Sequence, residues 1–229
     1  NKKNKSKIVS LTAYSKNIAK ILDKYCDIVL VGDSVANVLY GLNNTHKVNL
    51  ENMIQHTASV RKGIKKSLLV VDMPKGSYGN LKLAKKNAKL LMKKTDCDAV
   101  KIESNKKNFK IIKFLVKHKI PVMGHIGFTP QFKKKFKIEG DSKKKADKLL
   151  KEAKNIEKAG AFSIVLECIN SEASKLITNS LKIPTIGIGS SNNCDGQILV
   201  TDDMLGISGF YPKYVKKYLS LDRIIEKAI

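Results

Sequence analysis

The sequence predicts an α/β protein whose parallel strands close into a (β/α)8 barrel, and three observations lead to this fold. Short apolar runs rich in Val and Ile recur along the chain, segments with helical spacing of apolar residues separate them, and the chain has 229 residues. Repeated strand–helix units form a parallel sheet, and this length is typical of a (β/α)8 barrel. No glycine-rich dinucleotide fingerprint follows the first apolar run, which argues against an open doubly wound sheet.

Seven of the expected strands are apolar runs that are nearly continuous rather than alternating. Parallel strands buried on both faces have this pattern. The runs span residues 7–13, 27–33, 67–73, 98–104, 120–127, 162–168 and 183–189. Pro121 and Pro184 stand at the start of two strands, where a missing N–H is tolerated. We expect the eighth strand within 198–208, around Met204–Ile207.

The expected helices lie between these runs and carry apolar residues three and four positions apart. They span residues 15–25, 52–64, 81–94, 107–118, 145–160 and 172–181. Gly160 suits the end of its helix, because glycine adopts the left-handed cap conformation easily. Residues 211–229 predict a loop followed by one short amphipathic helix. With no linker or low-complexity block in view, we expect a single barrel domain over residues 1–229.

The chain is strongly basic, with a net charge of +24 that would ordinarily suggest a nucleic-acid partner. Only Arg61 and Arg223 are arginines, so 42 of the 44 basic residues are Lys. Surfaces that clamp phosphates or read bases favour Arg for its bidentate geometry. We therefore interpret the charge as a compositional bias that places Lys at solvated positions, with attraction of anionic substrates as a further reading. We expect no nucleic-acid partner.

The cysteines and the hydropathy bear on the compartment. Cys26, Cys97, Cys168 and Cys194 are widely scattered and form no CxxC pair, which predicts reduced thiols in an intracellular protein. No run approaches the roughly 20 apolar residues of a membrane span, so we expect no membrane partner. The expected location is cytoplasmic or mitochondrial, because a chain that begins at Asn1 rather than Met leaves room for an upstream targeting segment.

Four of the apolar runs end on an acidic residue: Asp33, Asp72, Glu103 and Glu167. One such residue alone is most simply a helix cap or an ion-pair partner. In a (β/α)8 barrel, however, the carboxyl ends of the strands form one face, so the four are expected to converge. Clustered carboxylates repel one another unless a cation neutralises them. Oxygen donors without paired Cys or His favour Mg²⁺ over Zn²⁺.

Further side chains are expected at the same face. Lys101 lies two residues before Glu103, so both point into the barrel, where a buried ammonium needs an anion such as a substrate carboxylate. Ser34 can donate a hydrogen bond to the same group. We place His125 with the substrate-binding residues, as a hydrogen-bonding group rather than a metal ligand. Glu167, on a separate strand, suits a general base.

Several motifs resemble ketopantoate hydroxymethyltransferases (3-methyl-2-oxobutanoate hydroxymethyltransferases), in that family's order and over essentially the whole chain. They are VGDSVANVLYG (31–41), VDMPKGSY (71–78), VKIES (100–104), PVMGHIGFTPQ (121–131), LECI (166–169) and IPTIGIGSSNNCDGQILVTDDMLGI (183–207). The resemblance implies a barrel of the phosphoenolpyruvate/pyruvate superfamily. It also implies transfer of a one-carbon unit from methylenetetrahydrofolate to 3-methyl-2-oxobutanoate with Mg²⁺, in pantothenate biosynthesis, by a homo-oligomer that is typically a decamer.

The resemblance also assigns roles to the residues already singled out. It implies that Asp33, Asp72 and Glu103 bind the metal, that Asp33, Ser34, Asp72 and Lys101 contact the substrate, and that Glu167 is the proton acceptor. The chain departs from the family pattern at Ser104–Asn105 and Ser190–Ser191, where the family usually has Gly-Gly and Ala-Gly, and at Lys75, where it has Phe. The segment 132–142 is also shorter than the family's glycine-rich loop. These departures fall on the folate side of the expected pocket and leave the metal motifs intact.

Two other hypotheses remain from the residues. Another Mg²⁺-dependent lyase or mutase of the same superfamily would share the 2-oxoacid site, but such enzymes often use a catalytic Cys in a mobile loop, and the sequence shows no such Cys. A Lys-rich nucleic-acid-binding protein would use the barrel only as a scaffold. Salt-sensitive retention on RNA or DNA that is indifferent to the loss of Asp33 would favour that second hypothesis.

Overall fold

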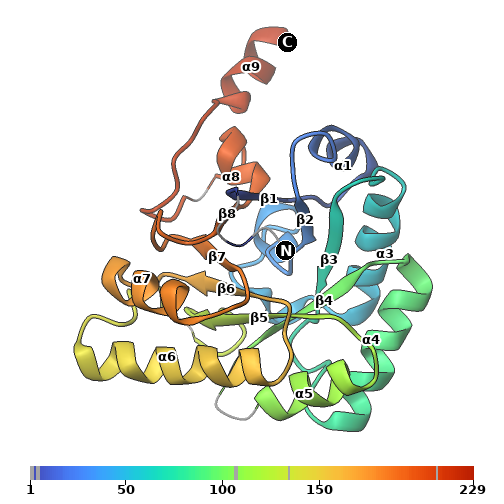
Figure 1. Cartoon of the computed structure of the whole chain (residues 1–229). Helices are drawn as coiled ribbons and strands as arrows, with labels where there is room; N and C mark the ends of the chain where they lie inside the picture. The colour runs from blue at the N-terminus through green and yellow to red at the C-terminus, as the bar shows by residue number, and fades with distance from the viewer. Residues whose placement is uncertain (1–2, 4–5, 106–107, 134, 210) are drawn as a thin grey trace.

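The computed structural model describes residue 3 and residues 6–105, 108–133, 135–209 and 211–229. In these residues eight parallel strands close into a barrel in the order of the chain, with β8 pairing back onto β1 (Figure 1). The strands are β1 (Ile8–Thr12), β2 (Ile28–Val31), β3 (Leu68–Asp72), β4 (Ala99–Glu103), β5 (Val122–Gly127), β6 (Ser163–Glu167), β7 (Thr185–Ile188) and β8 (Gly196–Leu199). The predicted (β/α)8 barrel is confirmed, and the seven apolar runs coincide with β1 to β7.

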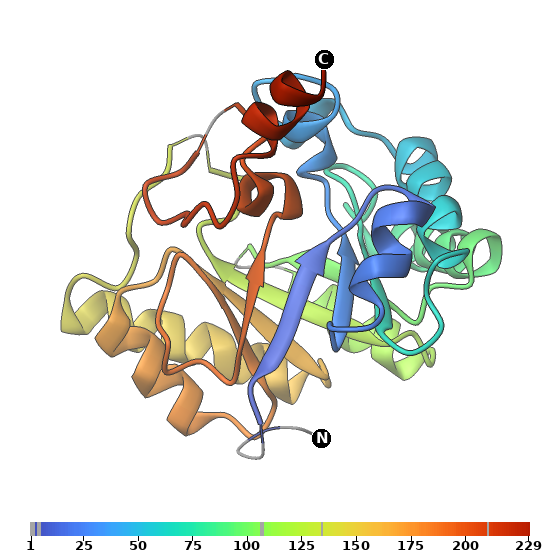
Figure 2. The same cartoon turned by 90° about the horizontal axis from the view of Figure 1, so that it is seen from above.

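Helices that connect successive strands cover the outside of the barrel (Figures 1 and 2). They are α1 (Lys16–Leu22), α3 (Leu50–Arg61), α4 (Leu81–Thr95), α5 (Phe109–Lys117), α6 (Lys143–Lys158) and α7 (Ser171–Ser180). The short helix α2 (Val35–Val38) and the 3-10 helix η1 (Thr45–Lys47) belong to the segment after β2, and α8 (Thr201–Leu205) and α9 (Leu221–Ala228) follow β8. Each predicted helix is present, although residue 107 of the range 107–118 lies outside the described residues. In this part of the chain no helix is both long and apolar enough to span a membrane.

The eighth strand was predicted in the wrong place. It spans Gly196–Leu199, and the expected position around Met204–Ile207 falls in α8 and the turn after it. Two acidic residues in the first turn of α8 suit a helix, because its N-terminus carries partial positive charge. Gly196 suits the strand, because a Cβ there would lie 2.5 Å from the main-chain oxygen of Ile8 on the neighbouring β1. Close backbone approach, which apolar content does not reveal, decides this register.

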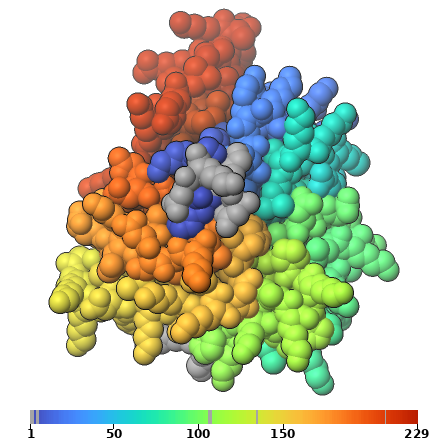
Figure 3. All heavy atoms as spheres, in the orientation of Figure 1, coloured from blue at the N-terminus to red at the C-terminus, as the bar shows by residue number. Residues whose placement is uncertain are grey.

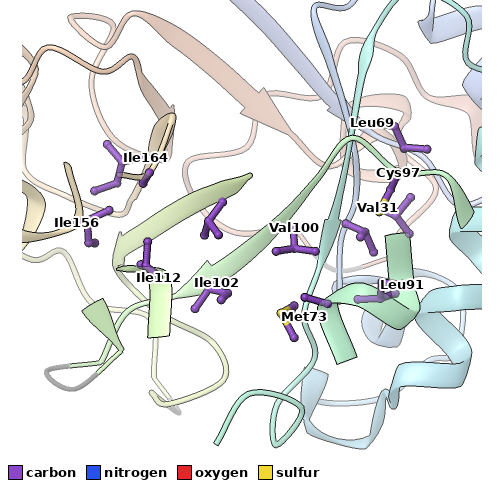
Figure 4. Packing of buried hydrophobic residues seen from close by; sticks show 14 of the residues in the cluster. Val31, Leu69, Met73, Leu91, Cys97, Val100, Ile102, Ile112, Ile156 and Ile164 are labelled. Carbon is purple, nitrogen blue, oxygen red and sulfur yellow. The ribbon is translucent and has the colours of Figure 1, made fainter. Parts of the chain in front are cut away.

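Alternation along the strands divides the buried side chains into two layers. The inner layer fills the barrel: Ile8, Ile28, Leu30, Val70, Ala99, Met123, Val165, Ile186 and Ile198. The outer layer packs the strands against the helices, as Val100 and Ile102 of β4 do with Leu91 and Ile112 in the same cluster (Figure 4). Because successive side chains of a strand point to opposite faces, the inward row of β4 continues from Ala99 through Lys101 to Glu103. The barrel interior is therefore apolar below and charged at its carboxyl end.

The C-terminal segment lies at the end of the barrel toward which β1 and β8 point (Figure 2). Its last helix, α9, stands out from the rest of the molecule (Figure 3) and has no buried residue. Ile224 and Ile225 on this helix are about half exposed, at 48% and 50%. The predicted short amphipathic helix within residues 211–229 is thus present, with its apolar side chains uncovered.

Candidate active site

The acidic residues singled out in the sequence converge at the carboxyl end of the barrel. Asp72, Glu103 and Glu167 are the last residues of β3, β4 and β6, and Asp33 follows β2 by two residues. The pairing register places Asp72 beside Lys101 and Glu103 beside His125. All are buried, with at most 8% of any of these residues exposed. These residues come close together because each stands at or near the carboxyl end of a strand, and the strands of a parallel barrel all end on the same face.

These side chains line one cavity of about 1020 Å³ at the mouth of the barrel. All seven residues predicted for the site border it: Asp33, Ser34, Asp72, Lys101, Glu103, His125 and Glu167. The rest of the wall comes from inward-facing strand residues such as Val165 and Ile198, the segment after β2, the β5–α6 loop and the C-terminal segment. Three aromatic side chains, Phe128, Phe136 and Tyr214, lie together on the wall, with the Phe128 and Phe136 ring centroids 4.2 Å apart.

Lys101 supplies the buried positive charge of the site. Its Nζ lies 2.9 Å from Asp72 Oδ1 and 3.2 Å from His125 Nδ1. Burial alone would lower the pKa of Lys101, but the charges of Asp72, Glu103 and Asp33 outweigh burial and raise that pKa above its ordinary value. The side chain is therefore an ammonium at neutral pH.

Two of the carboxyl groups are ionised only at a cost. Burial first, and then the charge of Asp72, raise the pKa of Asp33 to about 7, although Lys101 opposes this. Burial and the charge of Asp33 raise the pKa of Glu103 well above its ordinary value. Lys101 thus offsets only part of the negative charge that these groups would carry together. A site of this kind gains from a further cation.

His125 and Glu167 form a second pair, between the neighbouring strands β5 and β6. His125 Nε2 lies 3.1 Å from Glu167 Oε2, and burial followed by the charge of Lys101 lowers the pKa of His125 well below its ordinary value. The ring is therefore neutral. Because the Lys101 ammonium can only donate to Nδ1, the ring proton belongs on Nε2. That nitrogen has no hydrogen bond of good geometry among the described residues, which leaves its N–H for a ligand.

Glu167 has the environment of a proton acceptor. It is 8% exposed and borders the cavity, and burial raises its pKa to about 8 despite the opposing charge of Lys101. A carboxylate that is desolvated in this way is a stronger base than one in water. The geometry thus supports the role predicted for Glu167, which remains a prediction.

The donor set suits a hard cation, although the described residues do not form a finished metal site. Nowhere in this part of the chain do three His, Cys, Asp or Glu side chains come close enough to surround a metal ion. The three predicted ligands nevertheless offer buried carboxylate oxygens, the donors that Mg²⁺ prefers. Asp72 Oδ1 has its ion pair with Lys101 but no hydrogen bond of good geometry. The residues present therefore fit the predicted ion.

Sequence reasoning missed two residues that form hydrogen bonds with the predicted site residues. Gln131 donates hydrogen bonds to Asp33 and Glu103. The hydroxyl of Tyr14, a buried residue, lies 2.8 Å from Ser34 Oγ. Gln131 closes the motif GHIGFTPQ, so its place was in view but its contacts were not. A hydrogen bond between residues 98 positions apart leaves no periodic signal in the sequence.

The serines that depart from the family pattern form hydrogen bonds with neighbouring helices. Ser190 Oγ lies 2.7 Å from Ser174 Oγ, and Ser191 Oγ lies 3.1 Å from Ser171 Oγ, so both tie the end of β7 to α7. Ser104 Oγ donates to Glu152 on α6. None of these three serines borders the cavity. Of the short segment 132–142, residue 134 lies outside the described residues.

The comparison with known proteins decides the family. A family model described as ketopantoate hydroxymethyltransferase matches residues 1–229. The chain belongs to this family. Among ketopantoate hydroxymethyltransferases, the 3-methyl-2-oxobutanoate hydroxymethyltransferase of Pelagibacter ubique is 54% identical over 227 residues, covering 99% of this chain and 88% of that protein. One from Anaplasma marginale is 47% identical over 231 residues, covering 100% of this chain and 83% of the other.

Solved structures agree on the fold of this chain. A putative phosphonomutase from Burkholderia cenocepacia has a TM-score of 0.71 at 10% identity, covering 97% of this chain and 93% of that one. A 2,3-dimethylmalate lyase, a member of the PEP mutase/isocitrate lyase superfamily, has a TM-score of 0.65 at 14% identity, covering the same shares of the two chains. At this identity the likeness concerns the fold alone, and it confirms the barrel type implied by the motifs.

Proposed function

We propose that this chain is a Mg²⁺-dependent hydroxymethyltransferase that converts 3-methyl-2-oxobutanoate into ketopantoate (2-dehydropantoate), with methylenetetrahydrofolate as one-carbon donor. The family match over the whole chain supports the reaction. The observation that carries the assignment to this cavity is the buried Lys101 ammonium, which faces the same space as the buried Glu167 carboxyl group. One holds an anionic substrate, and the other accepts a proton from it.

Lys101 and His125 provide the anchor for the 2-oxoacid. The Lys101 ammonium donates a charge-assisted hydrogen bond to the substrate carboxylate. The Nε2–H of the neutral His125 ring offers a second donor, and the Ser34 hydroxyl a third, held by Tyr14. These donors converge from β4, β5 and the residue after Asp33, so they fix one orientation of a small planar acid.

Glu167 then removes the proton from C3 of the oxoacid, the carbon next to the keto group. The carbanion forms a bond to the methylene carbon of methylenetetrahydrofolate, both bonds from that carbon to the folate nitrogens break, and water supplies the hydroxyl group of the product. One nitrogen takes the proton from the Glu167 carboxyl group and the other takes a proton from the water, so tetrahydrofolate leaves and the base is restored. His125 stays neutral beside Glu167, with its Nε2 3.1 Å from Oε2 and the Nε2–H available to the substrate.

Asp33, Asp72 and Glu103 would hold Mg²⁺, which supplies Lewis-acid stabilisation of the enolate charge when bound. The protein's own part is to keep three carboxyl groups in a space with little water. Burial and the repulsion between these carboxylates make the free site electrostatically unfavourable, and burial together with the charge of Asp72 raises the pKa of Asp33 to about 7. A divalent cation removes that cost, so cation binding and ionisation of the carboxyl groups support each other.

The size of the cavity leaves space for the folate. A volume of about 1020 Å³ suits a drug-sized molecule and is far more than a five-carbon oxoacid needs. We place the flat ring of the donor against the aromatic wall formed by Phe128, Phe136 and Tyr214, where ring stacking is favourable. The polar side chains of Asn44 and His46 line the cavity as well and can hydrogen-bond the donor's ring edge.

The homo-oligomer implied by the resemblance is part of the same proposal. Half-exposed Ile224 and Ile225 on the protruding α9 support it, because apolar side chains on one face of a helix usually find a partner. Light scattering coupled to size exclusion measures the mass in solution. A mass of one chain at micromolar concentration would contradict the oligomer and leave the catalytic proposal standing.

A product assay tests the function. Purified protein is incubated with 3-methyl-2-oxobutanoate, methylenetetrahydrofolate and Mg²⁺, and ketopantoate is measured by mass spectrometry. The Glu167→Gln variant is the negative control, and Glu172→Gln, an exposed carboxyl group on α7, is the matched control. Ketopantoate from wild type and Glu172→Gln but not from Glu167→Gln supports the proposal. Failure of wild-type protein to form ketopantoate under these conditions would overturn it.

A further inference from the structure

Gln131, in the β5–α6 loop, is the centre of a buried network below the carboxylates. It is 1% exposed. Its main-chain N–H donates to Glu103 Oε2 at 3.0 Å, and its side-chain Nε2 donates to Asp33 Oδ2 at 2.9 Å and to the Met73 main-chain oxygen at 3.0 Å. One residue thus contacts two of the three predicted metal ligands and the residue that follows the third.

The orientation of the Gln131 amide is fixed on both sides. Its Oε1 accepts a hydrogen bond from the hydroxyl of Tyr78, which is 3% exposed. Turning the amide over would place Oε1 against the Asp33 carboxylate and the Met73 oxygen, which are both acceptors. Every polar atom of the side chain therefore has a partner that matches it, as a buried amide requires. The network joins the ends of β2, β3 and β4 to the loop after β5.

That the Gln131 side-chain amide is uncharged matters as much as its position. Asp33 and Glu103 are both buried and both accept hydrogen bonds from Gln131, so their negative charges lie close together and repel each other. A lysine between them would relieve the repulsion but would also compete with a divalent cation. An amide relieves it only in part and leaves the net negative charge for the ion. Gln131 contacts only one oxygen of each carboxylate, Asp33 Oδ2 and Glu103 Oε2, and does not use the other.

We propose that Gln131 is the positioning residue of the cation site: it holds Asp33 and Glu103 in the rotamers that bind Mg²⁺, and Tyr78 holds Gln131. The inference rests on the proposed function for the identity of the ion. Residues that hydrogen-bond metal ligands typically change metal affinity by roughly 10- to 100-fold when they are removed. Gln131 itself binds neither ion nor substrate.

Calorimetric titration of Mg²⁺ into the protein without substrate tests this role. Gln131→Met keeps the side-chain length and the main-chain bond to Glu103 but removes the side-chain hydrogen bonds. Tyr78→Phe removes only the hydroxyl. Gln197→Met is the matched control, because Gln197 is exposed on β8, donates to the Ser191 main-chain oxygen and does not border the cavity. Melting temperatures of all variants report folding independently.

We expect Gln131→Met to bind Mg²⁺ about 10- to 100-fold more weakly than wild type, Tyr78→Phe to lie between the two, and Gln197→Met to match wild type. Activity of Gln131→Met should return at raised Mg²⁺, which a purely structural defect would not allow. A folded Gln131→Met with wild-type Mg²⁺ affinity would overturn the inference. Should that variant not fold, wild-type affinity in Tyr78→Phe overturns it instead.

The same titration separates this inference from the proposed function. Wild-type protein that binds Mg²⁺ and forms ketopantoate, together with an unaffected Gln131→Met, refutes only the positioning role. Wild-type protein that binds no Mg²⁺ refutes both, because there is then no cation site for Gln131 to order.

Discussion

Replacing Glu167 with Gln should stop exchange of the C3 proton of 3-methyl-2-oxobutanoate with D₂O while the substrate and Mg²⁺ still bind. Gln has the shape of Glu, so the contact of the side chain with His125 on β5 can persist. The exchange reaction needs only enolisation and no folate. It therefore reports on the base without involving the aromatic wall of the cavity.

The size of the effect follows from the environment of the carboxyl group. Loss of a general base typically costs on the order of 10² to 10⁴ in rate. With a pKa of about 8, Glu167 is ionised in only about one tenth of the molecules at pH 7. Only the ionised form accepts a proton, so wild-type exchange should rise with pH up to about 8 and then level off. Because a nearby cation favours the carboxylate, Mg²⁺ should move this rise to lower pH.

Proton NMR measures the exchange directly, as loss of the C3–H signal over time. Glu172→Gln, on the surface of α7, should exchange like wild type. Exchange by Glu167→Gln at the wild-type rate would refute the assignment, and the base would then be sought in His125. Wild-type protein that exchanges C3–H but forms no ketopantoate would instead locate a defect on the folate side of the cavity.

Three further predictions concern the charges of the site. Lys101→Met should raise the KM for the oxoacid roughly 10- to 100-fold, because a charge-assisted hydrogen bond contributes about 1.5–3 kcal/mol. Steady-state kinetics measure this, and an unchanged KM would refute it. Asp33→Asn and Asp72→Asn should each abolish Mg²⁺ binding by calorimetry, and retained affinity in both would exclude them as ligands. The folded state raises the pKa of Glu167 from 4.5 to about 8. Its contribution to stability is therefore complete below pH 4.5 and lost as pH rises through 8. In EDTA, the melting temperature of wild type should fall relative to Glu167→Gln over this range, and parallel curves would contradict the shift.

The sequence by itself determined the barrel fold and which residues lie at the carboxyl end of the barrel. Nearly continuous apolar runs that alternate with amphipathic helical segments are typical of parallel strands covered by helices. Acidic residues at the ends of β3, β4 and β6 must then meet at one face, and the two-residue period of β4 places Lys101 on the inward side together with Glu103. These inferences need only local periodicity and the rule that parallel strands end together.

Only the tertiary structure decided the eighth strand, the ionisation of the site and its supporting network. β8 forms at Gly196–Leu199, where its backbone approaches β1 closely. The apolar content of residues 204–207, which suggested a strand there, does not reveal this approach. The raised pKa of Glu167 and the lowered pKa of His125 result from burial among charges from several strands. Gln131 reaches Asp33 across 98 positions of the chain. Such effects depend on distances between segments far apart in sequence, and only the folded barrel sets those distances.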